Sequence, residues 1–189
     1  MRQLLEMGKL SALFVVMTAS FLVSATLSAS SASNAQITTE ADKPACTQRR
    51  FHNLDRYAHQ RWYRVFRDKE VGPALRGLLK KDYRNLIESM RRASYPEDSP
   101  SYVDRKGVLT LRGFVPGLFT IMEAILIVEP CGNIYAAILD DGERFLYFSN
   151  DKEYIDRLPA EVERWRSGIE KLRSEFEKTP QLPIEFKSK

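Results

Sequence analysis

The sequence predicts an α+β fold: two N-terminal helices, a 3–4 stranded antiparallel meander and a C-terminal helix packed on the sheet. Three observations predict it. Apolar residues recur at helical spacing over residues 49–92, strand-type residues dominate between 107 and 148, and helical spacing returns after Pro159. This order is typical of helices packed on one face of an antiparallel sheet.

The first 35 residues predict a secretory signal peptide. Arg2 and Lys9 precede an apolar run over residues 10–27, and a stretch of small residues then ends at Ala35. A basic start, an apolar middle and small residues before a cut are typical of such signals. A run of this length could instead remain as a membrane anchor, but its Ser and Thr residues favour cleavage near Ala35. We therefore expect a periplasmic protein with no stable membrane insertion after cleavage.

The rest of the chain is expected to form one domain. Residues 36–45 are polar and lack periodicity, which predicts a flexible mature N-terminus. Residues 46–189 are long enough for a single α+β domain with its own core.

Charge divides this domain into two halves. Residues 46–94 hold 13 Lys and Arg against 5 Asp and Glu, whereas residues 95–189 hold 13 against 17. The basic half could bind anionic lipid or acidic polymers, or its cations could simply cover the solvated side of two helices. Nucleic acid is not an expected partner, because export removes the protein from it.

The chain contains two cysteines, Cys46 and Cys131. In an oxidising compartment, an even pair without metal-type spacing predicts one structural disulfide. The bridge would close a loop of about 85 residues, which the chain-entropy model values at roughly 4 kcal/mol.

Two basic amphipathic helices are expected first, over residues 49–68 and 74–92, separated by Gly72 and Pro73. Strands are expected over four further segments: 107–112, 118–129, 133–139 and 144–148. Asp141-Gly142 between the last two predicts a hairpin turn.

The last helix is expected to begin near Pro159 and to bury a stripe that includes Val162, Trp165 and Ile169. The tail that follows contains two prolines. Its apolar residues Ile184 and Phe186 are expected to dock back on the sheet.

No catalytic set is recognisable, so the protein is not predicted to be an enzyme and no cofactor is expected. Motifs for serine hydrolases, zinc proteases and nucleotide-binding loops are all missing. On a continuous helix, His52, Asp55 and His59 would share one face and could bind zinc. This spacing is common by chance in an amphipathic helix, so solvated polar residues are expected and no metal site is predicted.

Glu123 interrupts an apolar strand segment whose two faces are both apolar. If it were buried, its pKa would rise or it would need a basic partner. A position at the sheet end, open to water, is the alternative.

The segment 94–104 is the best candidate for recognition. Its prolines limit the entropy lost on ordering, its tyrosines offer rigid contact area, and its acidic residues supply charge. An ordinary connector between helix and strand would explain the segment nearly as well. The predicted binding residues, including one from the next turn, are Tyr95, Glu97, Asp98, Tyr102, Asp104 and Phe114.

Residues 128–165 resemble the periplasmic inhibitors of vertebrate lysozyme, which have a Cys-Gly turn, a strand hairpin and a later helix. Residues 129–132 (EPCG) correspond to the end of that family's inhibitory loop. The cysteine-bounded loop itself, with its Pro-His pair, is missing, so no inhibitory residue is carried over. The resemblance implies that small envelope proteins with a disulfide include inhibitors.

Two functions follow as expectations. The first is an inhibitor or immunity protein that binds and occludes a cell-wall-directed enzyme, such as a hydrolase or toxin. The second is an envelope accessory or structural protein whose basic helices bind anionic lipid, peptidoglycan or a membrane complex. An unpaired sheet edge would also permit a homodimer.

Overall fold

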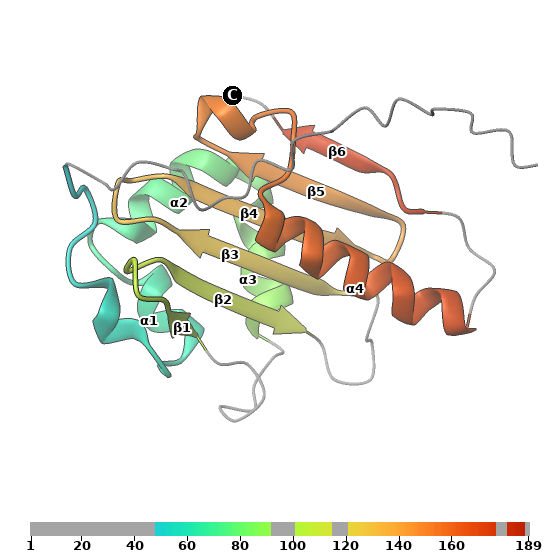
Figure 1. Cartoon of the computed structure of the whole chain (residues 1–189), viewed down its shortest axis with the longest axis horizontal. Helices are drawn as coiled ribbons and strands as arrows, with labels where there is room; N and C mark the ends of the chain where they lie inside the picture. The colour runs from blue at the N-terminus through green and yellow to red at the C-terminus, as the bar shows by residue number, and fades with distance from the viewer. Residues whose placement is uncertain (1–47, 92–100, 115–120, 177–180, 188–189) are drawn as a thin grey trace, which may run out of the picture. The chain divides into compact units, whose positions relative to one another are not determined.

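The computed structural model describes residues 48–91, 101–114, 121–176 and 181–187 (Figure 1). The chain divides into two units, residues 1–37 and 38–189, and every described residue belongs to the second. The predicted signal peptide and flexible N-terminus therefore lie outside the described residues.

Within these residues the centre of the fold is one sheet with the strand order β1-β2-β3-β4-β5-β6. Neighbouring strands are antiparallel except β5 and β6, which are parallel. The strands are β1 (Tyr102–Val103), β2 (Leu109–Phe114), β3 (Glu123–Val128), β4 (Ile134–Asp140), β5 (Arg144–Ser149) and β6 (Ile184–Lys187).

The α+β class is confirmed, but the sheet has six strands rather than three or four. The two additional strands lie at its edges. Strand β1 is only two residues long, too short for an alternating pattern to show. Strand β6 follows helix α4 (Ala160–Phe176), which carries the chain back along the sheet and so allows parallel pairing. The expected docking of the tail is confirmed: the ring centroids of Phe186 and Tyr147 lie 5.6 Å apart.

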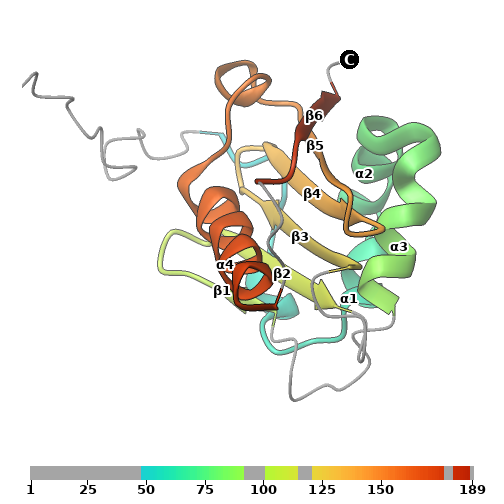
Figure 2. The ribbon, with the colours of Figure 1, turned by 90° about the vertical axis from the view of Figure 1, so that its right-hand side faces the viewer.

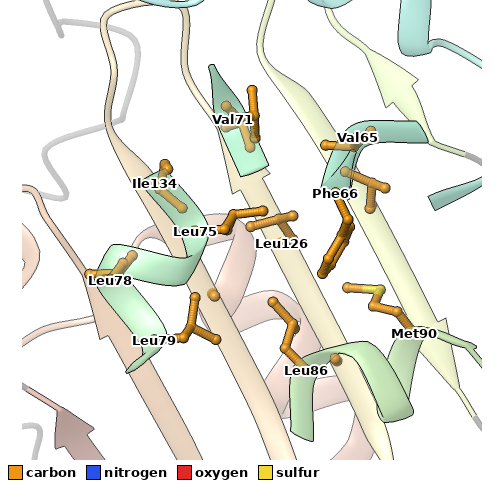
Figure 3. Close-up of a cluster of buried hydrophobic side chains, with 14 of the residues drawn as sticks. Val65, Phe66, Val71, Leu75, Leu78, Leu79, Leu86, Met90, Leu126 and Ile134 are labelled. Atoms are coloured by element: carbon orange, nitrogen blue, oxygen red, sulfur yellow. The ribbon is translucent and has the colours of Figure 1, made fainter. Parts of the chain in front are cut away.

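Helices cover both faces of the sheet, so the expectation of helices on one face is wrong. Helices α1 (Trp62–Phe66), α2 (Val71–Leu79) and α3 (Tyr83–Arg91) cover one face, and α4 covers the other (Figure 2). Strand β3 shows both environments. Leu126 packs in the cluster under α2 and α3 (Figure 3), whereas the adjacent Ile125 packs in the cluster under α4.

The helix expected over residues 74–92 is broken in two. The 3₁₀ turn η3 (Lys80–Asp82) separates α2 from α3, and Lys80 has φ 51° and ψ −116°. The break was not predicted because apolar spacing continues across it. After the turn, Leu79 of α2 and Leu86 of α3 both face the sheet (Figure 3).

Helix α3 packs very closely on strand β2 at Gly113. A Cβ atom at this position would lie 2.7 Å from the Cα of Met90. Glycine is therefore required by the contact between helix and strand backbones.

The predicted turn between β4 and β5 is confirmed. Asp141 has φ 49° and Gly142 has φ 69°. Positive φ at both positions suits the right-handed twist of a hairpin.

Helix α4 is also confirmed, and its Trp165 contacts the Phe145 ring edge-on at 5.5 Å. In the described part of the chain, no helix combines the length and apolar character needed to cross a membrane.

Candidate functional site

A cleft of about 570 Å³ opens beside α1 (labelled in Figure 1). It is formed by the 3₁₀ helix η2 (Leu54–Tyr57), by α1 and by the residues that lead into α2. Four of its lining side chains are cationic, one is acidic and two are tyrosines. They are Arg56, Tyr57, Tyr63, Arg64, Arg67, Asp68 and Lys69.

The cleft exists because the helix expected over residues 49–68 does not form as one element. Asn53 and His59 have left-handed backbone conformations, with φ 54° and φ 57°. The reason lies in Ser101, which is remote in sequence. The His59 N–H donates to the Ser101 carbonyl at 2.8 Å, and the Ser101 hydroxyl donates to the Tyr57 carbonyl at 2.5 Å. These bonds take up backbone groups that a continuous helix would use internally.

Asp68 is the buried centre of the cleft, with its side chain 3% exposed. Its Oδ1 accepts hydrogen bonds from the N–H groups of Glu70 and Val71 at 2.7 and 2.8 Å. Its carbonyl accepts from the N–H of Gly72 at 3.0 Å. Asp68 thus accepts from N–H groups at the start of α2, in the manner of a capping residue, and the same side chain anchors the cleft.

The other carboxylate oxygen of Asp68 binds two side chains of the cleft. Its Oδ2 accepts from the Tyr57 hydroxyl at 2.5 Å and from the Arg56 guanidinium. The Arg56 guanidinium also lies 4.8 Å from the centroid of the Tyr57 ring. Arg56 is therefore held in place by an ion pair and by a cation–π contact.

Burial alone would raise the pKa of Asp68. Hydrogen bonds from Tyr57, Val71 and Glu70, together with the charge of Arg56, outweigh burial and hold this pKa below its ordinary value. Burial, and then the hydrogen bond to Asp68, raise the pKa of the Tyr57 phenol. At neutral pH Asp68 is therefore an ionised acceptor whose charge is already matched by Arg56.

Among the described residues, the remaining cations of the cleft have no acidic partner. Arg64, Arg67 and Lys69 are exposed, and none forms an ion pair with the part of the chain that is described. The Arg67 guanidinium lies 5.5 Å from the centroid of the Tyr63 ring. The cleft thus has an excess of positive charge, and its guanidinium groups can bind a carboxylate or phosphate through paired hydrogen bonds.

The predicted binding residues that the structure describes do not line this cleft. Tyr95, Glu97 and Asp98 lie outside the described residues. Tyr102 lies on the edge strand β1, is 38% exposed, and donates a hydrogen bond to Glu161 Oε1 at 3.0 Å. Tyr102 and Asp104 are the exposed members among the three that the structure describes, and Phe114 is half-buried.

Asp104 and Phe114 are separated along the sheet. Asp104 Oδ1 accepts from the N–H groups of Lys106 and Val108 at 2.8 and 2.9 Å, so this carboxylate forms the β1–β2 turn. Phe114 is half-buried at the end of β2, four residues beyond Thr110, the partner of Tyr102. At about 3.3 Å per residue, Phe114 is roughly 13 Å along the strand from that pair.

The helical face expected to carry His52, Asp55 and His59 does not exist, because the backbone leaves the helical conformation at His59. His52 Nδ1 lies instead 3.8 Å from a carboxylate oxygen of Glu70. Within the described ranges, no group of three or more His, Cys, Asp or Glu side chains could hold a metal ion.

Glu123 is the first residue of β3 and is half-buried. It pairs with Phe114 on one side and Leu139 on the other. Glu123 therefore lies at the end of the sheet. This is the position expected from the sequence as the alternative to burial.

Cys131 is exposed in the turn between β3 and β4. The N–H groups of Arg50 and Phe51 donate to the Pro130 carbonyl at 2.7 and 3.0 Å, which brings the start of the described chain to this turn. Cys46 precedes Arg50 by four residues but lies outside the described part of the chain. The bridge therefore stays a prediction that this arrangement favours.

The comparisons with known proteins add no relative. No protein family, no curated protein and no solved structure matches the chain. The resemblance of residues 128–165 to lysozyme inhibitors remains a hypothesis from the sequence.

Sequence reasoning missed Asp68 and both tyrosines of the cleft. A signal for Asp68 was present: an Asp shortly before an apolar run with an early Pro73 is typical of a helix N-cap. Tyr57 and Tyr63 carried no comparable signal, because the expected helix gave them no common surface.

Proposed function

We propose that this protein is an exported envelope protein that binds an anionic group in its basic cleft. One observation carries the proposal: Arg64, Arg67 and Lys69 line the same cleft as Arg56, and no acidic side chain of the described chain pairs with these three. This proposal corresponds to the expected accessory protein that binds through its basic residues, and it assigns the binding to the basic cleft.

Electrostatics supports a ligand rather than a purely structural role. Like charges gathered around one cleft repel each other and destabilise the folded state. Asp68 cannot relieve the repulsion, because its charge is matched by Arg56 and its oxygens accept four hydrogen bonds. A bound anion would supply the missing countercharge.

The site is also prepared for binding before a ligand arrives. Asp68 and the Tyr57 ring hold Arg56, and the Tyr63 ring contacts Arg67. Side chains that are already restricted lose less entropy when they bind. The lack of a recognisable catalytic set in the sequence is consistent with binding rather than catalysis.

The test is a titration of the mature protein, recovered from the periplasm, with inorganic pyrophosphate. We expect saturable binding by calorimetry, and binding at least tenfold weaker in the double variant Arg64→Gln/Arg67→Gln. The control is Lys152→Gln/Lys171→Gln, which removes the same charge from exposed positions on η4 (Lys152–Tyr154) and α4. Equal binding by both variants would refute the proposal. Sequencing the N-terminus of the recovered protein tests cleavage near Ala35 and export.

A second function is favoured by Tyr102. This tyrosine is exposed on an edge strand and directly follows the segment that contains Tyr95, Glu97 and Asp98. We propose as the alternative that this region binds and occludes a cell-wall-directed enzyme, as an inhibitor or immunity protein would. Affinity capture from envelope and secreted proteins tests it: one stoichiometric enzyme should be recovered, and Asp98→Lys should weaken the complex. Recovery of the same partner at the same strength by the variant would argue against this surface.

A further inference from the structure

A second group of unpaired cations lies at the junction of α2 and α3. This junction cluster consists of Arg76, Lys80 and Lys81, all exposed. The Arg76 guanidinium lies 5.8 Å from the centroid of the Tyr83 ring. The charge of Lys81 contributes to the lowered pKa of Glu185 on β6, but none of the three cations makes a close ion pair with a described residue.

Both groups belong to the same helical layer. Val65 of α1, Leu75 of α2 and Leu86 of α3 all pack in one cluster against one face of the sheet. A helix that buries one stripe against a sheet directs its polar side away from it. Figure 2 shows α2 and α3 on one side of the sheet and α4 on the other. The exposed Arg64 of α1 and Arg76 of α2 therefore lie on the outer side of the α1–α3 layer, and the two exposed lysines of the junction cluster lie in the turn that joins α2 to α3.

This layer also lacks the apolar centre that a stable protein interface uses. In the described chain, the large hydrophobic residues with the highest exposure are Tyr102, Ile121, Ile155 and Leu172. None of them belongs to α1, α2 or α3. Contact through this side would therefore depend on charge, with no insertion of apolar side chains.

We infer that the outer side of the α1–α3 layer docks on an anionic phospholipid bilayer. The cleft contacts lipid phosphates, and the junction cluster makes a second contact with the same surface. An extended surface of uniform negative charge can contact both groups of cations at once. A single small anion can contact only one of them. The inference rests on the proposed anion binding by the cleft and adds the source of the phosphate and the second contact.

The expected loss of bilayer binding follows from the contribution of a single basic residue. A basic residue close to an anionic bilayer strengthens binding by about 1 kcal/mol, or roughly fivefold. Removing both lysines of the junction cluster should therefore weaken binding about 25-fold. Salt should weaken it as well, because the Debye length falls from about 30 Å at 0.01 M to about 10 Å at 0.1 M.

The experiment is sedimentation of the mature protein with vesicles of phosphatidylglycerol and phosphatidylethanolamine. Vesicles of phosphatidylcholine alone and purified cell-wall sacculi form the comparison arms. We expect salt-sensitive binding to the anionic vesicles alone, weakened about 25-fold in Lys80→Gln/Lys81→Gln and less than twofold in the control Lys152→Gln/Lys171→Gln. Thermal unfolding checks that each variant is folded.

Other outcomes overturn the inference. If the protein fails to bind anionic vesicles at low salt, or binds sacculi alone, the lipid surface is wrong. If the junction variant binds like the wild type, the second contact is wrong. Because pyrophosphate binding is measured separately, its persistence in either case would leave the proposed function standing.

Discussion

Helix α4 and the layer of α1, α2 and α3 cover opposite faces of one sheet, and both are rich in arginine. On α4, Arg164 pairs with Glu161, and Arg166 pairs with Glu163 and Glu170. In the layer of α1, α2 and α3, Arg64 and Arg67 have no acidic partner among the described residues.

The arginines of α4 therefore have ion-pair partners that give them a structural role, whereas Arg64 and Arg67 have no such partner among the described residues. Ion pairs three or four residues apart support a helix by a few tenths of a kcal/mol, so the arginines of α4 have a sufficient structural role. The lack of such a partner for Arg64 and Arg67 among the described residues is the basis of the proposed anion binding. Four predictions test or sharpen this contrast.

The largest expected effect is on Asp68, the one acid that the cleft uses. Asp68→Ala leaves Arg56, the Tyr57 hydroxyl and two backbone N–H groups without their acceptor. We expect a loss of about 3–5 kcal/mol in the free energy of unfolding, measured with urea at pH 7. Asp55→Ala, at an exposed site nearby, is the control and should change it by less than about 0.5 kcal/mol. A loss as small as that of the control would show that Asp68 does not anchor the cleft.

The next effect concerns the predicted disulfide between Cys46 and Cys131. It would join the chain that precedes the α1–α3 layer to the turn between β3 and β4. We expect Cys131→Ser to lower the free energy of unfolding by about 2–4 kcal/mol. The reductant dithiothreitol should lower the wild-type midpoint and leave that of the variant unchanged. Two free thiols in the purified native protein would contradict the bridge.

The pH dependence of stability should report on the same carboxylate. The pKa of Asp68 is lower in the folded than in the unfolded protein, so its contribution is present above the unfolded pKa and is lost as pH falls through the folded value. We expect wild-type stability to fall below about pH 4. Asp68→Asn, which cannot titrate, should show a shallower fall over the same range. Parallel pH profiles for the two proteins would assign the acid sensitivity to other groups.

The smallest effect compares one arginine from each layer. Arg166 is 14% exposed and bonds to two glutamates, so Arg166→Ala should lower the free energy of unfolding by about 1–2 kcal/mol. Arg64→Ala should change it by less than about 0.5 kcal/mol, because no acidic side chain of the described residues pairs with Arg64. Equal losses of unfolding free energy in the two variants would show that the arginines of α4 and of the α1–α3 layer do not differ in structural role.

Several features could be predicted because they depend on neighbouring residues. The Asp141-Gly142 turn requires two left-handed positions in succession, and its residues suit them. Helix α4 was predicted from its apolar stripe. The apolar character of both faces of the β3 segment already indicated helices on two sides, although the expectation of a single helical face did not use it.

The cleft could not be predicted, because it depends on contacts between distant residues. The helical spacing over residues 49–68 is real, but hydrogen bonds to Ser101 interrupt the helix. The acidic recognition segment was predicted from composition alone. Asp104, one of its charges, proves to be used within a turn.

By itself, the sequence determined the fold class, the local turns and the concentration of positive charge in residues 46–94. Each of these follows from composition or from spacing along a short stretch of chain. The tertiary structure decided which helices cover which face, where the first helix breaks and which arginines find a carboxylate. The physical reason is that periodicity reports how a segment divides apolar from polar residues. The partner of a charge or of a backbone group is chosen by packing between segments far apart in the chain.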